Sequence, residues 1–146
     1  MLIATTRSPS ANPGVVFDGG RSRDVSLTSL AVSIPPDRTR TIGEVQWPRS
    51  VPPDPMRSFA TLDVTPLDGA GSARHWLDGN LPKSRRVLIF VHGFNNRFED
   101  AVYRYAQIVH DSGVRAAPVL FTWPSRGNVF AYGYDRESTN FSRDAF

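Results

Sequence analysis

The sequence predicts an α/β fold in which a β-rich, proline-rich segment, residues 1–70, precedes a βαβ unit within residues 71–146. Eight of the 12 prolines lie before Met56, and short β-like runs separate them. Further along the chain, two apolar runs flank a segment with helical periodicity. This is the pattern of two parallel strands joined by a helix.

Length and composition place the chain among ordinary globular domains. It has 146 residues, of which 40% are hydrophobic and 21% charged, so a single domain with a real core is expected. The net charge is +3, but basic and acidic residues are interleaved along the chain. A nucleic-acid groove needs clustered cations, so we expect no nucleic-acid partner.

The absence of certain residues and patterns narrows the possible chemistry and the expected compartment of the protein. There is no cysteine, which excludes disulfides, thiolate catalysis and cysteine-based zinc sites. No apolar run approaches the ~20 residues of a membrane span. The first residues, MLIATTRSPS, lack the basic and apolar regions of a signal peptide, so the cytoplasm is the default expectation.

In the first half, alternating or β-branched runs predict short strands joined by turns. Pro35-Pro36 ends one of them, and SVPPDP (50–55) cannot be regular structure, so it is expected to be a surface connection. The expected strands are LIATT (2–6), VSLTSLAVSI (25–34), TIGEVQW (41–47) and FATLDVTPL (59–67).

The second half begins with a short helix candidate, SARHWLDGNL (72–81), with Ser72 available as N-cap and Gly79 near its end. RVLIFV (86–91) is apolar at every position after its arginine, as expected of a strand buried on both faces in a parallel sheet. PVLFTW (118–123) predicts a second such strand.

Residues 96–112 predict an amphipathic helix between these two strands. Asn96 and Glu99 resemble a capping box, and Gly113 is placed to end the helix. The connection should cross over with a right hand. One apolar stripe follows the helical period, and it contains Phe98, Ala101, Val102, Tyr105, Ala106 and Val109.

The junction VHGFNN lies where the first apolar strand meets this helix. Ligands of open parallel sheets collect at the carboxyl ends of the strands, beside helix N-termini. Gly93 would let the backbone turn sharply, which would bring the amides of Phe94 and Asn95 to the mouth of the helix. Backbone N–H groups fixed there can stabilise an oxyanion, which is worth ~3–4 kcal/mol per donor.

Four ordered segments carry a family resemblance that spans nearly the whole chain: ATTRSP, FVHGFNNRFEDAVYRYAQ, PVLFTWPSRG and YGYDRES. Together they resemble the α/β-hydrolase superfamily, and most closely a bacterial α/β-hydrolase-like family of unknown function. The resemblance implies that the amide of Phe94 or Asn95 serves an oxyanion hole. It implies that His92, with Gly93, supports this turn and is not the general base. It also implies that relatives are often exported or lipid-anchored, which leaves the compartment open.

The sequence departs from this family in one respect. An α/β-hydrolase needs a nucleophile elbow, usually G-x-S-x-G, followed by an acid and a histidine, and no G-x-S-x-G occurs here. The resemblance implies that the whole triad lies beyond Phe146, after a helix opened by STNFSRDAF (138–146). Residues 1–146 are then a single incomplete domain, the N-terminal half of an α/β-hydrolase-type sheet. We expect this chain to be inactive alone as an esterase or lipase, with a small acyl or ester substrate for the full enzyme and no metal or organic cofactor.

Other polar residues carry weaker indications. Ser125 follows the second apolar strand on the ligand side, where it could contact substrate or simply occupy a turn. Tyr132 and its neighbours Tyr134, Asp135 and Arg136 fit either the rim of a pocket or the packing of a loop. His75 and His110 are expected to be structural, since the three histidines do not have zinc-site spacing.

Two alternatives to a hydrolase remain at this stage. A non-catalytic product could bind a partner or itself. In the hydrolase strand order VLIFV would pair with VLFTW on one side and with a strand absent from this sequence on the other, leaving an apolar edge. A nucleotide-binding βαβ module is disfavoured, because HGFNN has one glycine where G-x-G-x-x-G is needed.

Overall fold

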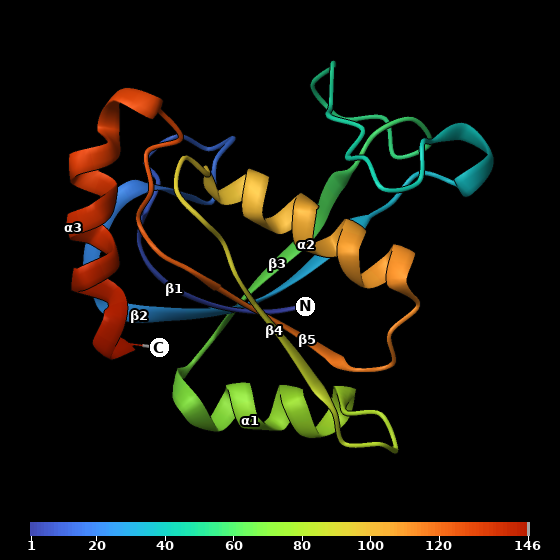
Figure 1. The fold of residues 1–146 in the computed structure, drawn as a ribbon. Coiled ribbons are helices and arrows are strands. Elements are labelled where there is room, and N and C mark those ends of the chain that lie inside the picture. Colours follow the sequence, from blue (N-terminus) through green and yellow to red (C-terminus); the bar gives the residue numbers. More distant parts are fainter. Residues whose placement is uncertain (146) are drawn as a thin grey trace.

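The computed structural model describes residues 1–145, and Phe146 lies outside the described residues. Its centre is a five-stranded sheet with the order β3-β2-β1-β5-β4 (Figure 1). β1 pairs antiparallel with β2 and parallel with β5, so one sheet combines an antiparallel and a parallel half. The strands are β1 (Leu2–Pro9), β2 (Phe17–Ser33), β3 (Ala60–Leu67), β4 (Val87–Val91) and β5 (Ala117–Thr122). The predicted α/β fold is confirmed, and the expected strands 2–6, 25–34, 59–67, 86–91 and 118–123 all lie within or across these elements.

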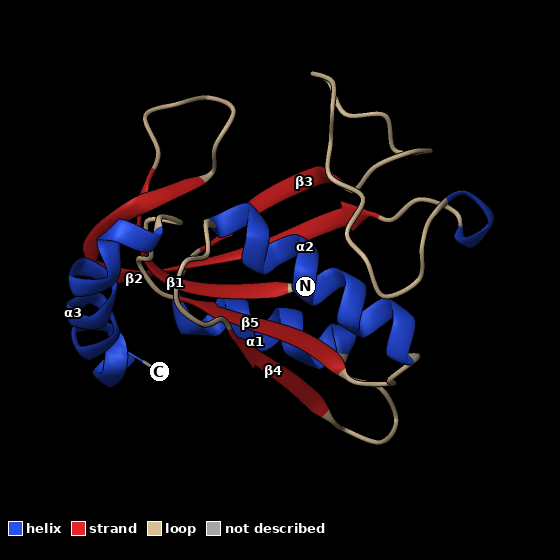
Figure 2. Cartoon of the chain, turned by 45° about the horizontal axis from the view of Figure 1, so that its top comes forward, coloured by secondary structure: helices blue, strands red, loops and turns tan. Residues whose placement is uncertain are grey.

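Helices cover the sheet on two faces and at one end. Figures 1 and 2 show α1 and α2 on opposite faces, with α3 beside the end of the sheet where β1 finishes. The helices are α1 (Gly69–Asn80), α2 (Phe98–Ser112) and α3 (Tyr132–Ser142), with 3₁₀ turns at Asp37–Thr39, Val129–Ala131 and Arg143–Ala145. α3 begins six residues before the helix start expected at Ser138.

The apolar stripe predicted for residues 96–112 forms the main core contact of α2. Five of its six members are buried, and Val109 packs partly buried against the same cluster. The stripe meets Ile3, Leu30 and Leu120 from three neighbouring strands. Each buried side chain of this size stabilises the fold by ~1.5–3 kcal/mol, so α2 is held by packing more than by helix propensity.

Tyr105 adds a polar link between α2 and the parallel strands. Its hydroxyl donates to the carbonyl oxygen of Leu88 in β4 and accepts from the N–H of Val119 in β5. Burial raises the pKa of this hydroxyl to about 12, so it remains protonated and able to donate. The side chain is fully buried, and its ring stacks on Phe90.

The N-terminal end of α2 is capped by residues other than those expected, whereas its C-terminal end is as predicted. Asn96 and Glu99 do not form a capping box. Instead Arg97 is the N-cap, and its N–H donates to the Asp100 carboxylate at 2.7 Å. The helix starts one position later than the pattern indicated because Asn96 is bonded to the neighbouring loop. Gly113 ends the helix in the left-handed conformation with φ 61°, as predicted.

The start of α1 also differs from the expectation. Ser72 is not the N-cap, because the helix already begins at Gly69 and Asp68 occupies the cap position without a side-chain bond. Gly69 has φ 68°, a conformation that lets β3 turn directly into the helix. The helix starts about one turn earlier because Asp68, also a common N-cap residue type, directly precedes it.

Residues 41–47, expected to form a strand, are an irregular loop. Gly43 breaks the alternation with φ 86°, and its N–H donates to the Asp111 carboxylate at the end of α2. Arg40, with a nearly buried side chain, forms ion pairs with both Asp111 and Asp37. Bonds to Arg40, Gln107 and Gly43 hold the pKa of the Asp111 carboxyl below its usual range. The segment is therefore fixed by α2 rather than by a neighbouring strand.

The strand β4 is an edge strand and not a strand covered on both faces. It pairs in parallel with β5, and the described residues provide no partner on its other side. Leu88 and Phe90 pack against the core, whereas Val87, Ile89 and Val91 point away from it and are 42%, 54% and 44% exposed. The apolar side chains at every position of this strand predicted that both of its faces would be covered. Residues 1–145 cover only one face.

Candidate functional site

Three parallel strands end at the same edge of the sheet and bring distant parts of the chain together. β4 and β1 both run parallel to β5, so the residues that follow Val91 and Thr122 lie near the end of β1. The first turn of α3 lies at the same edge (Figure 1). The VHGFNN junction and the loop after β5 therefore meet here, as expected from the βαβ pattern.

His92 lies directly after β4 and is buried, with 4% of its surface exposed. The backbone N–H of Trp123 donates to Nε2 at 3.1 Å, so Nε2 must be unprotonated. Nδ1 therefore carries the proton and donates to the carbonyl oxygen of Gly93 at 2.8 Å. Burial lowers the pKa of His92 to about 4, with the charge of Arg7 acting in the same direction. The imidazole is neutral, and its two nitrogens join the turn at Gly93 to the residue after β5, Trp123.

Arg7 is the largest fully buried side chain at this edge, with 1% exposed. Its guanidinium donates to backbone carbonyls in three separate segments: Asp18 at 3.2 Å, Ser125 at 2.9 Å and Asn96 at 2.8 Å. Its Nε also donates to Thr122 Oγ1 at 2.8 Å. Desolvation lowers the pKa of Arg7 to about 10, so the group stays charged at neutral pH.

Arg7 was not among the residues singled out from the sequence, although a signal was present. Ile3, Thr5 and Arg7 alternate along β1, so all three side chains point to one face, and all three are buried. A charged residue in phase with buried ones must find partners inside the protein. Those partners lie 85 to 118 residues away, together with the closer Asp18, and no local pattern could name them.

The expected oxyanion turn has a left-handed residue, but that residue is Asn95 and not Gly93. Asn95 has φ 61°, whereas Gly93 has no positive φ, and a Cβ there would meet nothing within 4 Å. The steric reason given for Gly93 is therefore wrong. Asparagine tolerates the left-handed region better than most residues, which explains its place at the tip of the turn.

The amides of this turn are not all free. The Asn95 N–H donates to Asp135 Oδ2 at 3.2 Å, and the Asn96 N–H donates to Ser125 Oγ at 3.0 Å. Within residues 1–145 the Phe94 N–H has no hydrogen-bond acceptor. Phe94 is 39% exposed, and its ring meets Tyr132 edge-on.

Asp135 and Ser125 form a buried pair beneath the turn. The Ser125 hydroxyl donates to Asp135 Oδ2 at 2.5 Å, and the Arg126 N–H donates to Asp135 Oδ1 at 3.0 Å. Both residues are 1% exposed. Ser125 therefore lies below the surface and not at a pocket rim, and its oxygen is engaged on both sides.

A shallow hollow of about 240 Å³ opens above this pair. Tyr132 lines it, as do Asp135 and Arg136, so both earlier readings of this segment hold in part. Tyr134, by contrast, packs inward: its hydroxyl donates to the carbonyl oxygen of Gly19 at 2.9 Å. The remaining lining residues are Phe94, Trp123, Thr139 and Asn140.

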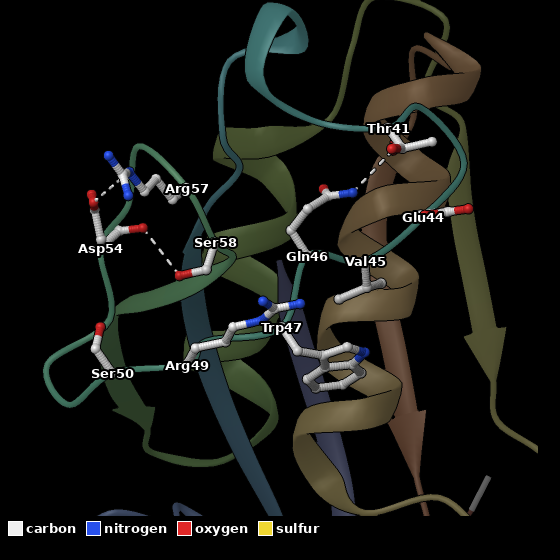
Figure 3. A pocket seen from close by; sticks show the side chains of 10 residues that line it. All are labelled: Thr41, Glu44, Val45, Gln46, Trp47, Arg49, Ser50, Asp54, Arg57 and Ser58. Atoms are coloured by element: carbon white, nitrogen blue, oxygen red, sulfur yellow. Dashed lines mark hydrogen bonds and ion pairs between the residues drawn. The ribbon is translucent and has the colours of Figure 1, made fainter.

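Two larger hollows lie in the loop region between β2 and β3. One, of about 630 Å³, is enclosed by residues 41–58 (Figure 3), where Gln46 donates to the carbonyl oxygen of Thr41. The other, of about 1080 Å³, lies between residues 47–53 and the first turn of α2. Neither is lined by His92, Phe94 or Asn95, so the turn itself faces only the small hollow.

The described part of the chain offers no converging set of metal ligands, because no three His, Asp or Glu side chains of residues 1–145 meet at one point. His110 pairs with Asp37 at 3.4 Å, and His75 is exposed on α1. None of the described helices is long and apolar enough to cross a bilayer.

Comparison with known families supports the resemblance seen in the motifs. A family model described as an alpha/beta hydrolase of unknown function (DUF900) matches residues 69–146, which is more than half of the chain. No curated protein and no solved structure matches the chain. The matched region starts at α1 and includes β4, the VHGFNN turn, α2, β5 and the Asp135 segment. The chain belongs to this family of α/β hydrolases of unknown function.

Proposed function

We propose that residues 1–146 provide the oxyanion-binding part of a serine-type acyl hydrolase that acts on an ester or related acyl substrate. The observation that carries the proposal is the VHGFNN turn at the carboxyl edge of the sheet, next to the N-terminus of α2, in a chain of the α/β-hydrolase family. A backbone N–H fixed in this position can donate to the oxygen that becomes negative when a serine attacks a carbonyl.

The nucleophile and its base have to come from residues outside this sequence. Ser125 is buried, and its hydroxyl already donates to Asp135. His92 is neutral with both nitrogens engaged, so it has no free nitrogen with which to take a proton from a serine. No G-x-S-x-G occurs among the 146 residues.

A reactive serine probe tests the proposal. We expect a fluorophosphonate to leave the 146-residue chain unlabelled, and the chain to hydrolyse an activated short-chain ester no faster than buffer. The source DNA should then be read past the codon for Phe146 and any continuation expressed. Labelling at a serine of a downstream G-x-S-x-G would support the proposal. Labelling of Ser125, or turnover by the chain alone, would refute the division of roles.

A second candidate function rests on a different observation, the exposed apolar face and unpaired edge of β4. Three of its five side chains are more than 40% exposed, and edges of this kind pair with other chains. A non-catalytic role would then be association of this chain with another copy of itself. The masses of the native chain and of Ile89→Lys in solution test this role.

A further inference from the structure

We propose that Asp135 is the positioning residue of the oxyanion turn. Its buried carboxylate holds the N–H of Asn95, which leaves the N–H of Phe94 as the donor for the substrate oxyanion. The assignment of Phe94 rests on the proposed function, whereas the clamp on Asn95 is independent of it. The sequence and the family resemblance left Phe94 and Asn95 equivalent.

The clamp is anchored on both sides of the site. Asp135 Oδ2 accepts from Asn95 N–H and from the Ser125 hydroxyl, and Oδ1 accepts from Arg126 N–H. All three partners donate to the carboxylate, and the two backbone N–H groups could not accept a hydrogen bond from a donor put in its place. One side chain from α3 therefore joins the turn after β4 to the loop after β5.

The next amide is fixed by the same network. Asn96 N–H donates to Ser125 Oγ, and the Asn96 carbonyl accepts from the Arg7 guanidinium. Asn95 is held between this anchored residue and His92, in the left-handed conformation. A segment bonded at each end and at its middle has little freedom, which is what an oxyanion donor requires.

A backbone N–H has one hydrogen to donate, and that of Asn95 is already engaged at 3.2 Å. A substrate oxygen at Asn95 would have to displace a carboxylate that is 1% exposed and holds two other donors. The Phe94 N–H makes no hydrogen bond within residues 1–145, and its side chain lines the hollow above the turn. Of the two candidate amides, that of Phe94 is thus the one open to a ligand.

Amide hydrogen exchange by NMR tests both halves of the proposal on the 146-residue chain. In the native protein we expect slow exchange at Asn95 and fast exchange at Phe94. Asp135→Asn presents an amide NH₂ to one of the donors, so Asn95 exchange should rise at least about tenfold and its proton should move upfield. Phe94 should stay fast.

Ser138→Ala is the matched control. Ser138 is buried on the same helix, one turn from Asp135, and accepts from Arg21 Nε at 3.0 Å without touching the turn. It should weaken the docking of α3 to a similar degree, yet leave the Asn95 proton in place and its exchange slow relative to the core amides. A shift at Asn95 in both variants would mean general loosening, and would overturn the specific role of Asp135.

A measurement on the native chain covers the case in which Asp135→Asn does not fold. A through-hydrogen-bond coupling between the Asn95 nitrogen and the Asp135 carboxyl carbon should be detectable. If it is absent and Asn95 exchanges quickly, or if Phe94 is as protected as Asn95, the proposal is wrong. These readings need no catalysis. If Asp135 does not bind the Asn95 N–H, the hydrolase proposal stands with both Phe94 and Asn95 as possible donors. If the serine probe fails to label the extended protein, the hydrogen bond between Asp135 and Asn95 is unaffected.

Discussion

Trp123 binds His92 through two hydrogen bonds, one from its backbone and one from its side chain. The Trp123 N–H donates to His92 Nε2 at 3.1 Å, and the indole Nε1–H donates to the His92 carbonyl oxygen at 3.0 Å. The two rings are stacked with centroids 4.8 Å apart. Because Nε2 serves as an acceptor here, protonating this histidine would destroy the contact, and stability must depend on pH.

The first prediction concerns this dependence. Burial lowers the pKa of His92 from an ordinary 6.5 to about 4, so the unfolded chain binds an extra proton between these values. Stability is therefore fully present above pH 6.5 and falls as the pH drops, by ~3 kcal/mol at pH 4. Urea unfolding of the native chain and of His92→Gln, compared at several pH values, measures the loss.

The difference in free energy of unfolding between the native chain and His92→Gln should disappear towards pH 4, since the variant lacks the titrating group. Glu99, whose pKa is raised by burial, acts in the opposite direction in both and cancels in the comparison. His75→Gln, at an exposed position of α1, serves as control and should follow the native curve. Parallel curves for the native chain and His92→Gln would contradict the prediction.

The second prediction concerns Arg7. Arg7→Met should lower the free energy of unfolding by ~3–5 kcal/mol, because three buried or partly buried carbonyl oxygens lose their donor at once. Arg7→Lys keeps the charge but cannot reproduce the planar fork, so it should recover less than half of the loss. Denaturant unfolding of both variants gives the values. Arg74→Met, at an exposed position of α1, is the control and should change stability by no more than ~0.5 kcal/mol.

The third prediction compares two glycines. Gly127 has φ 60°, and a Cβ there would lie 2.5 Å from Arg97 Cγ, so Gly127→Ala should cost ~1–3 kcal/mol. Gly133 lies in α3 with open space around it, and Gly133→Ala should be neutral or stabilise by up to ~1 kcal/mol. The melting temperature of Gly127→Ala should therefore be clearly lower than that of Gly133→Ala. Equal melting temperatures would contradict both the strained backbone at Gly127 and its close approach to Arg97.

The fourth prediction tests the exposed face of β4. At micromolar concentration the chain should elute larger than a monomer, and Ile89→Lys should shift it towards monomer, because a charge on this face disfavours pairing. Light scattering after size exclusion gives the mass. Leu62→Lys places the same charge on β3, the opposite edge strand, and should leave the mass unchanged. A monomeric native chain would eliminate the self-association candidate.

Local patterns predicted the elements that depend on local physics. The period of Phe98, Val102 and Tyr105 marked α2, and the family motifs placed the turn at His92. The strand predicted for residues 41–47 does not form. Its alternating pattern said nothing about a neighbouring strand, and the segment is instead a loop bonded to Asp111. A run of alternating residues forms a strand only where a partner edge exists.

Local sequence patterns could not identify the hydrogen bonds by which Arg7 and Asp135 position the turn after β4. Arg7 and Asp135 come from opposite ends of the sequence, and each acquires its role from bonds to backbone groups whose chemistry is the same in every residue. A side chain that binds carbonyls or amides has no required partner type, so nothing in the sequence identifies the pair. Topology alone brings them to one edge.

The central place of β1 has a consequence for synthesis. β1 pairs with β5 in the middle of the sheet, and Thr5 bonds to Thr122 across 117 residues. At ribosomal rates of ~5–20 residues per second, the two strands emerge roughly 6 to 23 seconds apart. Until then Arg7 has almost none of its acceptors, and β1 can pair only with β2. Such high contact order predicts slow, late folding, with the nascent antiparallel strands exposed to chaperones while β5 is still being made.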